Sequence, residues 1–95
     1  MAEDGDRPPF PADLGMAVAR AGVDPTLPRK ALLTALRGAI ADRGGYIDWD
    51  MDRRGWVVML LAPEREEFRA QELEQAFAWC LVWLMRDEFA GGALA

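Results

Sequence analysis

Apolar residues recur at helical spacing in the first half of the chain. From Asp13 to Ala21 and from Thr26 to about Arg43 they return every three or four positions, which predicts two helices. Asp13 and Thr26 carry side chains that cap helix N-termini, and Pro28 falls in a first turn, where a missing N–H costs nothing. Gly22 and Gly44-Gly45 are expected to end the two helices.

The spacing then changes to a period of two. Between Tyr46 and Met51 apolar and polar residues alternate, which predicts a half-buried strand. A turn at Asp52–Gly55 follows, in which Gly55 can adopt a positive φ angle. Trp56–Leu61 is apolar on both faces and is predicted to be a central strand, with Glu67–Ala70 as a short third strand. The last helix is expected from about Glu72 to Phe89.

The resulting order, α–α–β–β–(β)–α, predicts an α/β protein of the α+β type. The economical arrangement is a two-layer sandwich, in which helices cover one face of an antiparallel sheet. Residues 1–12 contain three prolines, a glycine and four charged residues, so we expect a flexible N-terminal arm. Residues 13–95 are expected to form a single domain, because a chain of 95 residues is short for two cores.

The last helix is predicted to be apolar on two sides. One stripe suffices to cover the sheet and consists of Leu73, Phe77, Cys80 and Leu84. The second faces elsewhere and consists of Gln75, Trp79, Val82, Trp83 and Arg86. A helix of this kind needs a second cover, either the N-terminal helix or the same surface of another copy. Because paired tryptophans beside an arginine are typical of interface hot spots, we expect a homodimer or a protein partner.

The composition excludes most catalytic chemistry. The chain has no His and no Ser, and its one Cys is Cys80, so Ser–His triads, Cys–His pairs, imidazole metal sites and disulfides are ruled out. Cys80 lies inside an apolar helical segment and is expected to be a small buried residue rather than a nucleophile. We therefore expect a non-enzymatic protein with no catalytic residues and no cofactor.

The net charge of −5 comes entirely from residues 48–95. An acidic surface repels phosphates and anionic lipids, so direct nucleic-acid or membrane binding is not expected. The longest apolar run, Ala76 to Met85, has ten residues and would span about half of a bilayer. Residues 1–12 lack the basic start and apolar run of a signal peptide, which predicts a cytoplasmic location.

Six carboxylates form the candidate acidic surface, namely Asp48, Asp50 and Asp52 together with Glu64, Glu66 and Glu67. The spacing of the aspartates resembles a calcium loop, but Arg53 and Met59 stand where that loop requires Gly and Glu. No metal site is therefore expected, and the aspartates are predicted to be the solvated face of an edge strand. The alternative function is a small acidic inhibitor, or antitoxin-like regulator, that presents these residues to a basic site of a nucleic-acid-handling protein.

Residues 14–37 offer a third candidate function, an accessory DNA-binding role. Ala17–Val23 resembles the first helix and turn of a helix-turn-helix repressor. Pro25 and Pro28 fall where the recognition helix should follow, and proline interrupts the helix that must enter the major groove. An accessory DNA-binding role therefore ranks behind the other two.

The segment from Tyr46 to Ala76 resembles the HicB-type antitoxin fold of bacteria and their phages. The matching positions are Asp52, Gly55, Trp56-Val57-Val58, Pro63 and Leu73-Glu74-Gln75-Ala76. The chain departs from the family in lacking its Pro-Gly-Cys loop and in placing Glu72 where the family has a capping Thr. The resemblance implies a hairpin packed on a helix and a role that depends on binding a partner.

Overall fold

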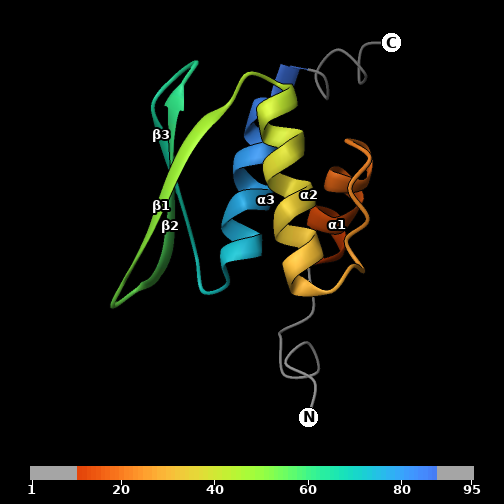
Figure 1. Ribbon diagram of the computed structural model, residues 1–95, viewed down its shortest axis with the longest axis horizontal. Coiled ribbons are helices and arrows are strands. Elements are labelled where there is room, and N and C mark those ends of the chain that lie inside the picture. The colour runs from red at the N-terminus through yellow and green to blue at the C-terminus, as the bar shows by residue number, and fades with distance from the viewer. Residues whose placement is uncertain (1–10, 88–95) are drawn as a thin grey trace.

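The computed structural model describes residues 11–87 as three helices and a three-stranded sheet (Figure 1). The predicted α+β class is confirmed. The elements are α1 (Ala12–Ala19), α2 (Arg29–Asp42), β1 (Tyr46–Asp52), β2 (Gly55–Ala62), β3 (Glu66–Ala70) and α3 (Leu73–Leu84).

The sheet is an antiparallel meander with the strand order β1-β2-β3, so β1 and β3 are its edges. The register pairs Trp49 with Val58, and Val58 with Phe68. These three side chains belong to, or pack against, the hydrophobic core. The two-residue alternation therefore directs apolar residues of all three strands toward the helices, as predicted for β1.

The helices cover one face of the sheet and leave the other open (Figure 1). α3 lies centrally, in contact with β2 and β3 on one side and with α2 alongside. α1 packs on α3 from behind the helix pair, on the side away from the sheet. The predicted sandwich is thus formed by the sheet and the α2/α3 pair, and α1 adds a further cover behind it.

Two glycines end the first two helices, as predicted. Gly22 and Gly44 have φ angles of +83° and +77°, a left-handed conformation that side chains with a Cβ rarely adopt. In each case the N–H of the residue after the glycine donates to a carbonyl near the end of the helix. Val23 donates to Val18 at 3.1 Å, and Gly45 donates to Ile40 at 2.9 Å. Both helices therefore end in Schellman-type caps.

The predicted helix starts are wrong by a few residues. α1 begins after Pro11, and Asp13 lies in its first turn rather than at the cap. α2 begins at Arg29 after Pro28, and not at Thr26, because both the N–H and the hydroxyl of Thr26 donate to Asp24 Oδ1, at 2.9 and 2.6 Å. This local turn competes with helix capping for the same groups.

The predicted α3 boundaries are also corrected in part. The helix begins at Leu73, one residue later than expected, and its N-cap residue Glu72 makes no side-chain capping bond. The helix also ends earlier than the expected position near Phe89: α3 stops at Leu84, with Met85 as its C-cap. Phe89 itself and most of the proposed arm at residues 1–12 lie outside the described residues.

Gly55 has the positive φ angle predicted for the hairpin, +117°. A Cβ at this position would lie 2.7 Å from the carbonyl oxygen of Ala70 on β3. We therefore expect Gly55→Ala to lower the free energy of unfolding by about 1–3 kcal/mol, through backbone strain and overpacking. Urea denaturation measures the change, and Gly38→Ala serves as the control. Since a Cβ on Gly38 would meet no atom within 4 Å, that helical substitution should stabilise by about 0.5–1 kcal/mol. Equal stabilities of the two variants would contradict this account of the turn.

Candidate interaction surfaces

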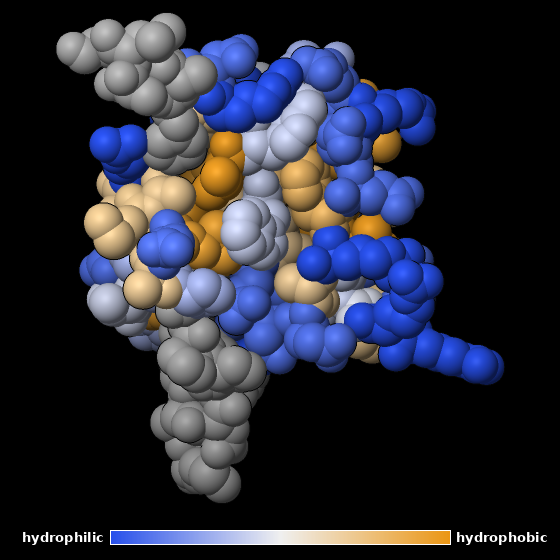
Figure 2. Space-filling model, turned by 180° about the vertical axis from the view of Figure 1, so that it is seen from behind, coloured by the Kyte–Doolittle hydropathy of each residue, from blue (hydrophilic) through white to orange (hydrophobic). Residues whose placement is uncertain are grey.

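The side of α3 that carries Trp79 is apolar and remains accessible to solvent. Trp79 is 46% exposed, and Gln75 and Val82 beside it are half-buried. Figure 2 views the molecule from behind and shows apolar and weakly polar residues gathered over its middle, with strongly hydrophilic residues along one margin. We call the set predicted from sequence the Trp79 surface, namely Gln75, Trp79, Val82, Trp83 and Arg86.

The structure distinguishes the two tryptophans of this surface. Trp83 is half-buried and packs its ring against Phe68 of β3, with 6.3 Å between ring centroids. The guanidinium carbon of Arg86 lies 3.6 Å from the centre of the Trp83 ring, a cation–π contact. Arg86 is also bonded to Glu64 at 2.9 Å. Trp83 is thus held in an ordered stack at the rim, and Trp79 is the aromatic side chain that projects.

The N-terminal helix provides part of the second cover that the sequence requires. Leu14 and Val18 of α1 are buried in the core cluster that also contains the buried residues of α3, and α1 packs on α3. This packing leaves Trp79 uncovered among the described residues. The intramolecular cover predicted as one alternative therefore exists, but it occupies a different sector of the helix from Trp79.

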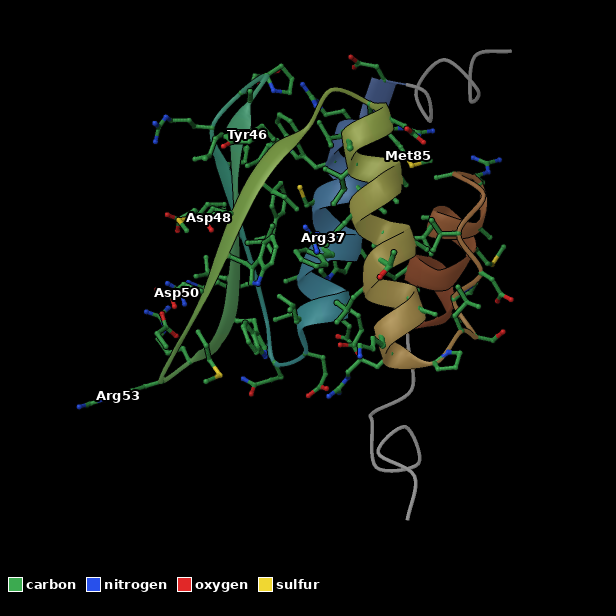
Figure 3. The ribbon with its side chains drawn as sticks, viewed as in Figure 1. Arg37, Tyr46, Asp48, Asp50, Arg53 and Met85 are labelled. Carbon is green, nitrogen blue, oxygen red and sulfur yellow. The ribbon has the colours of Figure 1, made fainter. Side chains whose placement is uncertain are left out.

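The aspartates of β1 lie on the open face of the sheet. Asp48 and Asp50 point away from the helices (Figure 3), and all three aspartates are exposed, as the alternation predicts. Asp52 accepts a bond from Arg69 of β3 at 2.7 Å. This bond, together with the N–H of Arg54, lowers the pKa of Asp52. The contribution of Asp52 to stability is therefore present at neutral pH and is lost as the pH falls through its lowered pKa.

Two of these carboxylates also cap the edge of the sheet. Asp48 Oδ1 accepts the N–H of Trp49, and Asp50 Oδ1 accepts the N–H of Met51, both at 2.8 Å. N–H groups of successive strand residues point to opposite sides, so those of Trp49 and Met51 are directed away from β2. The aspartates thus occupy donors that another strand would otherwise use, which is a specific form of the edge protection expected from the sequence.

The six predicted acidic residues do not form one surface. Glu67 lies opposite Met59, which itself lies opposite Asp48, so these carboxylates flank an apolar position on the open face. Glu64 lies instead beside Arg86 at the Trp79 surface. Within residues 11–87 no group of three or more potential ligands is close enough to hold a metal ion.

Residues 14–37 are not arranged as a helix-turn-helix. Residues 20–28 form turns and loop between α1 and α2. This connection is longer than the three- or four-residue turn of a helix-turn-helix. The buried face of α2, with Leu32, Leu36 and Ile40, belongs to the core, and the helix packs on α3.

A groove that sequence reasoning missed runs between α2 and the edge strand β1. Its volume is about 500 Å³, and its lining consists of Thr34, Arg37, Gly38 and Ala41 from α2 and Gly45, Tyr46, Ile47 and Trp49 from the start of β1. The guanidinium carbon of Arg37 lies 4.8 Å from the centre of a Trp49 ring. Small residues at helical spacing opposite aromatic strand residues were the available signal, but the pairing of α2 with β1 is visible only in the fold.

Cys80 is fully buried, as expected for a small apolar residue. Burial raises the pKa of its thiol to about 12, so the reactive thiolate is scarce at neutral pH. We expect a thiol reagent at pH 8 to label the native protein at least about 100-fold more slowly than the urea-unfolded chain, because labelling requires opening of the core. With an aromatic disulfide as the reagent, the absorbance of the aromatic thiolate that it releases reports the labelling rate. Rapid labelling of the native protein would contradict the burial of Cys80.

Comparisons with known protein families, curated proteins and solved structures found no match to this chain. The resemblance of residues 46–76 to the HicB-type fold therefore stays a prediction. No helix among the described residues is long and apolar enough to cross a membrane.

Proposed function

We propose that this chain is a non-enzymatic, cytoplasmic protein-interaction module that forms a homodimer through the Trp79 surface. The supporting observation is the 46% exposure of Trp79 on a helix whose other sides already pack against the sheet, α2 and α1. Burying a large apolar side chain contributes about 1.5–3 kcal/mol. A second copy supplies that burial without rearranging the core.

The rim of the surface favours a second copy as the partner. Arg86 and Glu64 are exposed, opposite in charge and adjacent to Trp79's helix face. In a two-fold dimer the same patch meets itself, so a patch carrying both signs of charge can be self-complementary. Trp and Arg are also the residues most enriched in binding hot spots.

Trp79→Glu tests the proposal. We expect sedimentation velocity to show a wild-type dimer and a Trp79→Glu monomer with an unchanged circular dichroism spectrum, because a charge on this surface opposes its burial. Met16→Glu is the matched control, since Met16 is 71% exposed on α1 and the substitution adds the same charge elsewhere. A wild type that is monomeric at the highest attainable concentration, or a Trp79→Glu dimer, would overturn the proposal.

One observation favours the acidic-regulator alternative. Asp48, Asp50 and Glu67 share the open sheet face with the apolar residue Met59. Such a face complements a basic, partly apolar site on a nucleic-acid-handling protein. Binding of an oligo-arginine peptide would then weaken as salt rises and on Asp48→Asn with Asp50→Asn, whereas an apolar homodimer changes little with salt.

A further inference from the structure

The groove between α2 and β1 lies beside a strand edge that is only partly capped. Asp48 and Asp50 occupy the N–H groups of Trp49 and Met51. The pairing with β2 is regular from Ile47 onward and shifts register only between Tyr46 and Ile47, so the same alternation directs the N–H and carbonyl of Ile47 away from β2. The residue before Ile47 is Tyr46, which has no carboxylate to fold back. The edge therefore keeps its pairing capacity at Ile47, inside the groove.

The opposite wall leaves room for a backbone. A Cβ added to Gly38 would meet no atom within 4 Å, and Ala41 one turn later has only a methyl group. Tyr46, 68% exposed, lies at the end of the groove where β1 begins. The space thus has an edge strand on one side and a small-residue helix face on the other, the arrangement in which extended peptides add to sheets.

The charge of the groove selects an anion. Arg37 is the charged member of the groove lining, in a chain whose net charge is −5. Its guanidinium is held over Trp49, and Trp49 lies two residues, about 7 Å, along β1 from Ile47. A peptide carboxylate that turns from the strand edge toward α2 meets this cation, whereas the carboxylate of Asp48 reaches the N–H of Trp49 from the open face of the sheet.

We propose that this groove binds the carboxyl-terminal end of an extended peptide as a fourth strand, parallel to β1. In parallel pairing, Ile47 donates to one peptide carbonyl and accepts from the N–H two residues later. When that later residue is the last of the peptide, its carboxylate lies toward Arg37 and needs no bond from the capped N–H of Trp49. This surface is separate from the Trp79 surface, so the proposal does not depend on dimerisation.

The probe is a mixture of N-acetylated tetrapeptides randomised at every position, with free carboxyl termini, and the same mixture with amidated termini. We expect the free-carboxylate mixture to shift the amide resonances of Ile47 and the Nε resonance of Arg37 in heteronuclear spectra. The amidated mixture should bind about tenfold more weakly, because a charge-assisted bond to Arg37 is lost. Arg37→Gln should reduce binding of the free-carboxylate mixture to the level of the amides.

Gly38→Leu keeps the test independent of folding. A Cβ on Gly38 meets no atom within 4 Å and leucine favours a helix over glycine, so the variant should be at least as stable as the wild type. The larger side chain beside the groove should abolish peptide binding. Trp79→Glu should bind the peptides as the wild type does. The proposal is overturned if millimolar peptide leaves Ile47 unshifted, if the amides bind equally well, or if Gly38→Leu retains binding.

Discussion

Replacing Phe77 by alanine is expected to lower the free energy of unfolding by about 3–5 kcal/mol. Phe77 is 1% exposed and meets the ring of Trp49 edge-on, with centroids 5.2 Å apart at 89°. It therefore joins α3 to the edge strand through a geometry that aromatic pairs favour. Removal of the ring leaves a cavity between the sheet and the helices that neighbouring side chains fill only in part.

Urea denaturation followed by circular dichroism measures this loss. Phe77→Leu is the matched variant and should cost less, because most of the apolar volume stays. Trp49 also lines the groove, so Phe77→Ala should broaden the Ile47 amide resonance even where the protein remains folded. A loss below 1 kcal/mol would contradict the central position of Phe77.

Arg29→Met is expected to destabilise the protein by about 3–5 kcal/mol, because it removes a cation from a buried carboxylate. Glu74 is 1% exposed in the first turn of α3, and Arg29 Nε lies 3.4 Å from its Oε2. The same guanidinium also pairs with Glu72. Arg29 thus links the N-terminal ends of α2 and α3, which are more than 40 residues apart in the chain.

A double variant separates the charge from the packing. Arg29→Met together with Glu74→Met should be more stable than Arg29→Met alone, since no carboxylate then remains buried without this cation. Arg69→Ala is the surface control. It breaks an exposed pair with Asp52 and should cost far less stability than Arg29→Met, because solvent screens the pair. A small, equal effect of Arg29→Met and Arg69→Ala in thermal melts would refute the buried pair.

The parts of the fold that depend on local chemistry were predictable from the sequence. Gly22, Gly44 and Gly55 carry their conformational role in their own backbone freedom, and alternation in residues 46–51 determines which face of β1 is buried. Thr26 shows the limit of local reasoning. It was predicted to cap α2, but its N–H and hydroxyl both donate to Asp24 in a turn that precedes the helix.

The features that depend on which elements meet were not predictable. The Arg29–Glu74 pair and the Arg37–Trp49 contact both require the packing of α2, and no spacing in the sequence encodes it. The Trp79 surface was predicted from the helical wheel, but Trp79 and Trp83 looked equivalent there. Only the position of β3 shows that Phe68 holds one tryptophan and leaves the other exposed.

The position of α1 behind the helix pair has a consequence for the order in which the molecule opens. α1 is an eight-residue helix that packs mainly on α3, whereas α3 also contacts β2, β3 and α2. Detaching α1 breaks one packing surface and leaves the sheet–helix core in place, so this motion has a lower free energy than global unfolding. Native-state hydrogen exchange should therefore divide the chain into two cooperative units, with α1 amides exchanging through a local fluctuation and those of β2 and α3 through complete unfolding.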